Sequence, residues 1–359
     1  MSPPSAGGIR VSAPGKLLVL GEYAVLKGAP ALVMAVGQRA RVTLRWIEGP
    51  VSVIESSLWP GREIPFHPDA PRTFQSGDPE TGQALSLVQH ILSWCCKNHG
   101  PLLTGSQAIR LELDTRDFYS QSGKLGLGSS AALTVALFAA IRAIRSVQEM
   151  DSRPSQLWPE LWQMYREQPD QRGSGVDIAA SCFGHWIRFQ NDPANGYPSV
   201  EAFSPKRPCP LLIVWTGHST ATRGMLERFF FWASKEPARF QRMIDTLTRI
   251  SEVGIVAFGA GESKRFRLAI DQYTEALGNL GIASGLEILS DKHARLLALA
   301  QSLGVSYKPS GAGGGDVGFA MAENQETLSV FRHRVEAIGY HIVETNQETQ
   351  GLEIRPIPE

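Results

Sequence analysis

Residues 124–133 read Lys-Leu-Gly-Leu-Gly-Ser-Ser-Ala-Ala-Leu, a glycine-rich turn that leads directly into a long apolar segment. Glycine has no Cβ, so the backbone can turn tightly here and approach a ligand closely. Strong helix formers continue to about residue 144, and Ser129 or Ser130 could cap the helix. The free N–H groups and the positive dipole end of such a helix favour an anion, for example the phosphates of a nucleotide. The turn predicts a phosphate-binding site, although a simple Gly-Ser helix cap gives the same local pattern.

Two further stretches combine glycine with lysine and other polar residues. Residues 13–26 read Ala-Pro-Gly-Lys-Leu-Leu-Val-Leu-Gly-Glu-Tyr-Ala-Val-Leu. Lys16 stands beside an apolar run there, so its ammonium group either reaches solvent or faces a charged ligand. Residues 308–318 read Lys-Pro-Ser-Gly-Ala-Gly-Gly-Gly-Asp-Val-Gly. This stretch is too rich in glycine to be an ordinary connection.

The three stretches, in this order, resemble the three motifs of the GHMP small-molecule kinases, a family named for galacto-, homoserine, mevalonate and phosphomevalonate kinases. Further segments are similar to the phosphomevalonate kinase branch: Phe118-Tyr119, Gly173-Ser174-Gly175-Val176-Asp177, Val214-Trp215-Thr216 and the Gly-Gly-Gly-Asp-x-Gly end of the third motif. The resemblance implies a two-lobe α+β fold. Residues 1–205 would form an N-terminal lobe like ribosomal protein S5 domain 2, and residues 206–359 a ferredoxin-like C-terminal lobe, with nucleotide and acceptor between them.

The resemblance also implies ATP-dependent phosphorylation of phosphomevalonate to diphosphomevalonate, with ATP and Mg²⁺ as cofactors. Phosphorylation of mevalonate, a related mevalonate-phosphate decarboxylation, and a non-catalytic metabolite sensor are alternatives. A phosphate acceptor has a second pKa near ~6, so it is largely deprotonated at neutral pH and needs no strong base. Cations that bring the two anions together should then dominate catalysis, whereas a mevalonate hydroxyl would need a general base.

Within this resemblance, catalysis falls to Lys16 and Asp177. Lys16 would bridge the γ-phosphate and the acceptor phosphate, while Asp177 would orient Lys16 and the metal, or act as the base toward a hydroxyl. The predicted ATP-phosphate site is Gly126, Leu127, Gly128, Ser129, Ser130 and Ala131. The predicted acceptor site is Lys16, Tyr23, Lys124, Ser310, Gly311, Ala312 and Gly313, and the predicted Mg²⁺ ligands are Ser130 and Asp177. On local grounds alone, Asp177 could be a helix cap and Lys124 a solvated lysine.

The composition of the 359-residue chain argues against several other classes of protein. Lys plus Arg and Asp plus Glu number 35 each, so there is no basic excess for nucleic acid or an anionic membrane. The four cysteines have no CxxC spacing, which argues against a zinc site or a disulfide framework. We expect no signal peptide and no membrane span. The expectation is a cytoplasmic enzyme with small-molecule partners, monomeric or homodimeric.

Hydrophobic periodicity predicts the remaining elements. Strands are expected at residues 9–13 and 17–20, broken at Pro14-Gly15, and at 31–36, 39–46, 109–113, 186–189, 211–214, 317–321, 341–345 and 352–355. Helices are expected at 83–98, 160–168, 224–233, 237–258, 263–280, 290–303 and 326–338, with 152–159 as a link. Residues 48–82 are expected to form a long surface excursion with room for one hairpin. Gly313, Gly315 and Gly318 match GxGxxG, but a predicted strand follows where a dinucleotide site needs a helix.

Overall fold

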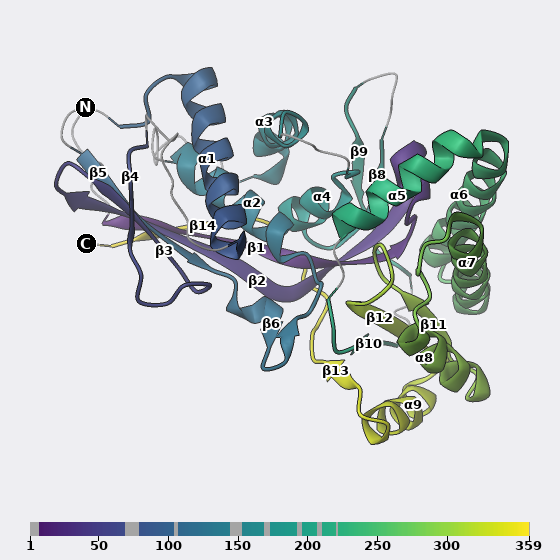
Figure 1. Cartoon of the computed structure of the whole chain (residues 1–359). Coiled ribbons are helices and arrows are strands. Elements are labelled where there is room, and N and C mark those ends of the chain that lie inside the picture. Colours follow the sequence, from purple (N-terminus) through teal and green to yellow (C-terminus); the bar gives the residue numbers. More distant parts are fainter. Residues whose placement is uncertain are drawn as a thin grey trace.

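The computed structural model describes residues 7–68, 79–103, 107–143, 153–168, 173–191, 196–206, 210–219 and 222–358. Within these residues the strands form an eight-stranded sheet, a four-stranded sheet and a hairpin of β6 (Tyr119–Ser120) and β7 (Gly123–Lys124) (Figure 1). The helices within residues 79–183 lie over one face of the larger sheet, those within residues 291–337 accompany the smaller one, and those within residues 222–284 contact strands of both sheets. The predicted two-lobe α+β fold is confirmed.

The larger sheet has the order β14-β1-β2-β5-β3-β4, and β8 and β9 extend it from β2. Its strands are β1 (Gly8–Leu20), β2 (Ala31–Glu48), β3 (Ser52–Ser56), β4 (Ile64–Phe66), β5 (Gln107–Asp114), β8 (Trp186–Gln190), β9 (Ser199–Ala202) and β14 (Glu353–Ile357). β3 pairs with β4 as a hairpin and runs parallel to β5. The hairpin expected within residues 48–82 is confirmed. It is part of the larger sheet and not a separate surface excursion. Residues 69–78 lie outside the described chain.

β1 runs without interruption through Pro14-Gly15, so the predicted break was wrong. Its register with β2 shifts between these two residues, and this irregularity accommodates the proline. A Cβ on Gly15 would lie 2.6 Å from both the carbonyl oxygen of Leu127 and the ring of Phe118. Only glycine permits this approach, which brings β1 against the turn at residues 124–133.

The helices over the larger sheet are α1 (Pro79–His99), α2 (Ser129–Ala143), α3 (Pro154–Arg166) and α4 (Val176–Phe183). α2 is central, because it packs against β1, β2, α1 and α4. α3 begins at Pro154, inside the stretch predicted to be a link, and proline is favourable in the first turn because its missing N–H would have no partner there. α1 begins four residues before the predicted start.

The smaller sheet has the order β11-β12-β10-β13, formed by β11 (Ser306–Pro309), β12 (Val317–Met321), β10 (Leu211–Trp215) and β13 (His341–Val343). One face packs through Val214, Tyr307 and Ala320 into a core with α8 (Asp291–Ser302) and α9 (Gln325–Ala337). The other face, including Trp215 and Phe319, joins the main core. β12 follows the third glycine stretch, which confirms the rejection of a dinucleotide site, whereas β11 was not predicted.

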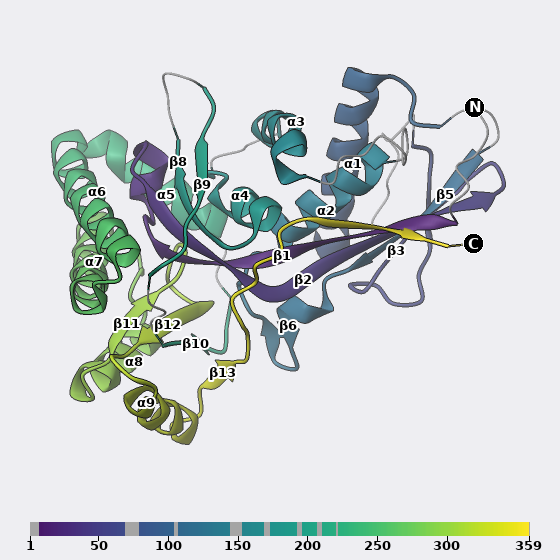
Figure 2. The ribbon, with the colours of Figure 1, turned by 180° about the vertical axis from the view of Figure 1, so that it is seen from behind.

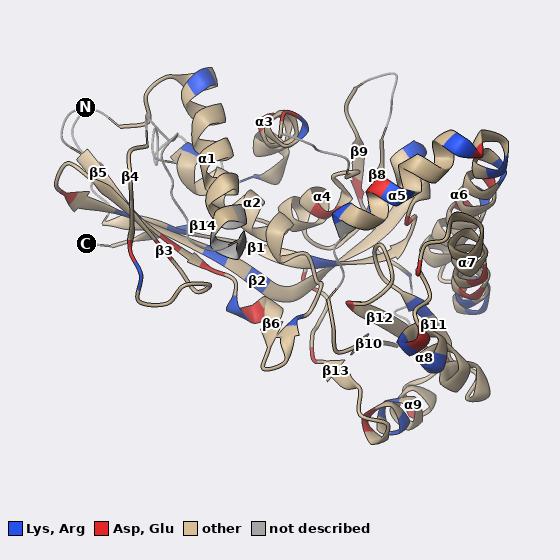
Figure 3. Cartoon of the chain, in the orientation of Figure 1, with Lys and Arg blue, Asp and Glu red and all other residues tan. Residues whose placement is uncertain are grey.

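Three long helices complete the fold: α5 (Thr222–Lys235), α6 (Pro237–Ala260) and α7 (Ser263–Ser284). α6 and α7 pack against each other at one end of the molecule, and α7 also contacts β11 (Figure 1). Lys and Arg are interspersed with Asp and Glu along the described elements (Figure 3). This distribution agrees with the equal numbers of acidic and basic residues.

The C-terminal segment connects the two sheets a second time. After β13 the chain runs back along the larger sheet and ends as β14, whose Ile357 pairs with Gly8 of β1 (Figure 2). Residues after 205 therefore contribute strands to both sheets, and the division at residues 205 and 206 stays a prediction.

Candidate active site

Lys16 and the glycine turn at residues 124–133 lie in direct contact. The backbone N–H of Lys16 donates to the carbonyl oxygen of Leu127 at 2.8 Å. Gly128 has a φ of 86°, and a Cβ there would lie 3.1 Å from Cγ and 3.4 Å from Cε of Lys16. The lysine side chain thus crosses the turn at a glycine, where no side chain obstructs it.

α2 begins immediately after this turn. The helix starts at Ser129 itself and Ala132 N–H donates to Gly128 O at 3.0 Å, so the residue preceding the helix is Gly128, and the expectation of a serine cap was wrong. The N–H groups of Ser129, Ser130 and Ala131 have no acceptor within the helix. Ser129 is buried while Ser130 is exposed, so Ser130 carries the accessible hydroxyl. These N–H groups and the helix dipole suit the phosphates of ATP.

The third glycine stretch packs against β1 and the residues after it, close to the end of the Lys16 side chain. Ser310 Oγ donates to Leu18 O and accepts from Leu18 N–H, both at 3.0 Å, and Tyr23 OH donates to Ala312 O at 2.6 Å. A Cβ on Gly311 would lie 3.9 Å from Nζ of Lys16. The structure therefore brings the Lys16 side chain beside both glycine loops, with its aliphatic part at Gly128 and its ammonium group at Gly311, although residues 16, 128 and 311 are far apart in the sequence.

The second and third motifs also touch each other through Asp316. A Cβ on Gly126 would lie 2.3 Å from Cβ of Asp316, so only glycine fits at this position. Asp316 has a φ of 57°, and its carbonyl oxygen accepts from both the N–H and the hydroxyl of Thr216 at 2.9 Å. The predicted site omitted Asp316, although the single acidic residue in the glycine run was a signal for it.

Two histidines hold the carbonyl groups of the third motif. His293 is buried, with Nε2 3.0 Å from Gly315 O and Nδ1 2.8 Å from the hydroxyl of Tyr307. A carbonyl can only accept, so Nε2 carries the proton and Nδ1 accepts from the tyrosine. Burial is the main cause that lowers the pKa of His293 to about 4. His218 Nε2 lies 3.1 Å from Gly314 O. No local pattern in the sequence indicated either contact.

A buried ion pair joins the first and third motifs. Lys308 on β11 pairs with Glu22, which follows β1, and the two side chains are 0% and 1% exposed. Burial lowers the pKa of Lys308, the carboxylate of Glu22 opposes this shift, and the nearby charge of Lys16 lowers the pKa further. Neither Glu22 nor Lys308 was among the predicted site residues, because a charged residue is normally expected at the surface.

Asp177 lies in the first turn of α4, where its Oδ1 accepts from the N–H of Ile178 at 3.0 Å. Burial raises the pKa of Tyr165, and the nearby carboxylate of Asp177 raises it further. Lys16 and Asp177 both lie in the described chain, and no ion pair joins them there. The orientation of Lys16 by Asp177 stays a prediction.

Lys124 lies on β7 at the entrance to the glycine turn. Its carbonyl oxygen accepts from Nε1 of Trp215 at 3.1 Å, which fixes the hairpin of β6 and β7 to the smaller sheet. The side chain is partly exposed. Gly313, also predicted to contact the acceptor, is packed so closely that a Cβ would lie 2.5 Å from Ile288 O.

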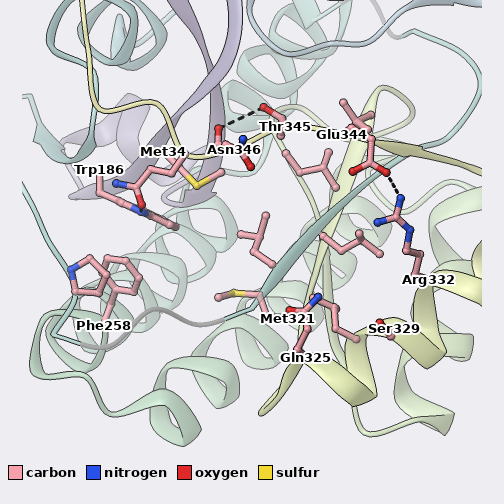
Figure 4. Close-up of a pocket in the computed structure, with 17 residues that line it drawn as sticks. Met34, Trp186, Phe258, Met321, Gln325, Ser329, Arg332, Glu344, Thr345 and Asn346 are labelled. Atoms are coloured by element: carbon pink, nitrogen blue, oxygen red, sulfur yellow. Dashed lines mark hydrogen bonds and ion pairs between the residues drawn. The ribbon is translucent and has the colours of Figure 1, made fainter.

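A separate cavity of about 320 Å³ lies at the seam between the two sheets (Figure 4). Its wall includes Met34 and Trp186 of the larger sheet, Met321 of the smaller sheet and Phe258 of α6. None of the predicted site residues lines it. Its two charged residues, Arg332 and Glu344, pair with each other. The glycine motifs, and not this cavity, carry the features of a phosphate site.

The residues at the motifs fit a nucleotide together with its metal. Within the described chain, no group of three or more His, Cys, Asp or Glu residues could hold a metal ion by itself. Mg²⁺ is usually held by one or two protein groups together with the substrate phosphates. The exposed hydroxyl of Ser130 and the carboxylate of Asp177 are groups of this kind. No helix among the described residues has both the length and the apolar character needed to cross a membrane.

Comparison with known proteins gives consistent matches over the whole chain. The sequence is 30% identical to phosphomevalonate kinase from Streptomyces sp. strain CL190, over 91% of this chain and 94% of that protein. It is 26% identical to phosphomevalonate kinase from Saccharolobus solfataricus, over 96% and 99%. The fold resembles Streptococcus pneumoniae phosphomevalonate kinase in complex with phosphomevalonate and AMPPNP, with a TM-score of 0.76, 19% identity and coverage of 94% and 99%. No family model matches the chain.

Proposed function

Since the chain belongs to the GHMP kinase family and is most like its phosphomevalonate kinases, we propose that it transfers the γ-phosphoryl group of ATP to phosphomevalonate, giving ADP and diphosphomevalonate. The observation that carries this proposal is the position of Lys16, whose side chain passes Gly128 of one glycine loop and places its ammonium group beside Gly311 of the other. A single cation there can contact the γ-phosphate and an acceptor phosphate together. The 30% identity over nearly the full length supports the choice of acceptor.

The geometry suits a reaction limited by charge repulsion. An oxygen of the acceptor phosphate attacks the γ-phosphorus, and the bond from that phosphorus to the β–γ bridging oxygen breaks as ADP leaves. The acceptor is largely deprotonated at neutral pH, so the chain has to neutralise charge more than remove a proton. Lys16 and the N–H groups at the start of α2 supply this neutralisation. We assign the acceptor pocket to Lys16, Tyr23, Lys124 and residues 310–313.

Bound Mg²⁺ would screen the ATP phosphates, with Ser130 and Asp177 as its protein ligands. Asp177 would then act on the metal and the phosphates rather than as a base. Cys95 and Cys182 are buried free thiols, and burial raises the pKa of Cys95 to about 12. Unreactive thiols of this kind agree with our proposal that the protein works in a reducing cytoplasm. Small molecules are the proposed partners, and the protein is proposed to be monomeric or homodimeric.

The test is ADP release by the purified protein with Mg-ATP and one of four acceptors: phosphomevalonate, mevalonate, diphosphomevalonate or homoserine. Phosphate and CO₂ are followed in parallel. We expect strong turnover with phosphomevalonate and no CO₂. Turnover with mevalonate alone would make the protein a mevalonate kinase with Asp177 as general base, and CO₂ would indicate a decarboxylase. Saturable binding without turnover would contradict any enzymatic function.

A further inference from the structure

The buried pair of Glu22 and Lys308 is not used by the mechanism above. Nζ of Lys308 also donates to Pro309 O at 2.8 Å and lies over the rings of Tyr273 and Phe319, 5.7 and 5.4 Å from their centroids. The backbone carbonyl of Glu22 accepts from the hydroxyl of Tyr273 at 2.8 Å. Both charges are thus enclosed by the protein and held by several directed contacts.

Stability alone does not account for this pair. Removing two charges from water is costly, and a buried ion pair can often be replaced by apolar residues of similar volume with little loss or even a gain of stability. The charge of Lys16 makes the protonated form of Lys308 less favourable still, because the two cations lie close to each other. A buried ion pair that adds little stability is better explained by the segment of backbone that it positions.

The pair holds the third glycine loop. Oε1 of Glu22 accepts from the N–H of Gly311 at 3.4 Å, and Gly311 is the residue of that loop next to Nζ of Lys16. Oε2 of Glu22 is buried and has no hydrogen-bond partner within the described chain. Lys308 therefore fixes the carboxylate, and the carboxylate contacts the loop at the point where the loop meets the proposed catalytic ammonium group.

We propose that Glu22 and Lys308 are positioning residues for phosphoryl transfer, because their pair fixes Gly311 beside the ammonium group of Lys16. Ser310 and Tyr23 anchor the neighbouring residues of the loop to β1 and to the turn after it. Only Glu22 reaches the backbone of Gly311 among the described side chains. The proposal depends on the proposed kinase activity for its kinetic test but not for its structural test.

Two double variants separate positioning from stability. E22M/K308M removes both charges and the acceptor for Gly311 N–H, whereas E22Q/K308M removes both charges but keeps an oxygen acceptor. The matched control is S251A, which removes a buried side-chain contact of 2.7 Å to Pro30 O away from the site. Each protein is characterised by its Tm, by kcat and KM for ATP and phosphomevalonate, and by hydrogen exchange at the amide of Gly311.

We expect E22M/K308M to stay folded, with kcat at least about tenfold lower and KM for ATP within about threefold of the parent, the pattern of a contact that matters in the transition state. E22Q/K308M keeps an acceptor for Gly311 N–H but lacks the lysine that holds it, so its kcat should fall by at least about threefold and no further than that of E22M/K308M, while S251A should keep the parental kcat. Parental kcat in either folded double variant would overturn the proposal.

Hydrogen exchange tests the same contact without any substrate. In the unmodified protein, the amide of Gly311 should exchange at least about tenfold more slowly than that of exposed Gly61, and faster exchange should follow in E22M/K308M. Equal rates for Gly311 and Gly61 in the unmodified protein would overturn the proposal even if no variant folds. If the unmodified protein turns over none of the acceptors, the proposed function fails, while the exchange result still decides whether the pair holds the amide of Gly311.

Discussion

At the scale of single residues, the contact between Gly128 and Lys16 gives the sharpest prediction. G128A should destabilise the fold by about 1–2 kcal/mol, because an alanine is strained at a positive φ. It should also lower kcat, since the new methyl group would displace the Lys16 side chain. Gly61 is the control, because its φ is 76° and a Cβ there would meet nothing within 4 Å. G61A should lose similar stability but no activity; equal kcat in both variants would contradict the assignment.

Lys16 itself should be indispensable if charge neutralisation carries the reaction. K16M keeps most of the aliphatic chain over Gly128 but removes the cation, so we expect kcat to fall by about 10²–10⁴ with little change in Tm. K97M, which changes an exposed lysine on α1, should leave kcat unchanged. Steady-state ADP release and thermal unfolding of both variants check this. A folded K16M with near-normal turnover would remove Lys16 from the mechanism.

His293 should make stability depend on pH. Its pKa is about 4 in the folded protein and its ordinary value is 6.5, so between these values the unfolded chain binds more protons. The contribution of neutral His293 to the free energy of unfolding is complete above about pH 6.5. It decreases toward pH 4 by up to about 1.4 kcal/mol per pH unit. H293Q should show a flatter decline of the unfolding free energy between about pH 6.5 and 5, measured in urea. H333Q, at an exposed histidine, should show the same pH dependence of the unfolding free energy as the parent. An H293Q protein whose unfolding free energy falls with pH as steeply as that of the parent would refute this account.

At the scale of elements, α2 is enclosed on nearly every side. All but two of its residues, Ser130 and Arg142, are buried, because helices α1 and α4 flank it above the sheet. Small residues such as Ala131, Ala132 and Ala136 allow these close approaches. The helix whose N-terminus we propose to bind the ATP phosphates is therefore held rigidly, as a preorganised site requires.

The packing of α2 can be measured through Leu137. Its side chain is completely buried, so L137A should lower the free energy of unfolding by about 2–5 kcal/mol through lost contacts and a residual cavity. L268A is the matched control on α7, where the leucine is 55% exposed, and should change stability by less than about 0.5 kcal/mol. Urea unfolding of both variants tests this. If L137A and L268A lost similar amounts of unfolding free energy, the close packing of α2 would not make the expected contribution to stability.

At the scale of the whole molecule, Arg39 fastens the C-terminal segment to the larger sheet. Its guanidinium donates to the carbonyl oxygens of Gln350, Gly351 and Ser12 at 3.0, 2.7 and 3.1 Å, and it pairs with Glu348 at 3.3 Å. The segment it holds connects β13 of the smaller sheet to β14 of the larger one. Arg39 thus binds the segment that runs from the smaller sheet back to the larger one.

Removing this arginine should weaken the whole fold. R39M leaves several carbonyl groups and a carboxylate without their donor, so we expect a loss of about 2–4 kcal/mol. R41M, which removes a half-exposed pair with Asp117 on the same strand, should lose about 0–1 kcal/mol. Denaturant unfolding compares the two variants. An R39M protein as stable as R41M would show that the other contacts of the segment, such as the backbone bonds between Ala35 and Glu348 and between Cys182 and Leu352, hold it without Arg39.

The local sequence determined the three motifs, their order and most of the helices and strands. A glycine turn followed by alanine and leucine must form a helix start, and alternating apolar residues must form strands, because these preferences act over a few neighbouring residues. The same local signals gave a wrong prediction where contacts with a neighbouring strand determined the backbone conformation. Pro14 does not break β1, because β2 holds the strand on both sides of the irregularity.

Only the tertiary structure decided which residues meet at the site. Glu22 and Lys308 are separated by 286 positions, and His293 of α8 contacts the loop between β11 and β12, 22 positions further along the chain. Nothing in either local sequence indicates these partners, because a buried charge is tolerated only when the folded chain supplies its counter-charge. The sequence thus determined the glycine and lysine content on which the proposed phosphate chemistry of the motifs rests, whereas long-range packing determined that Lys16 contacts two glycine loops and that a carboxylate of a buried pair contacts one of them.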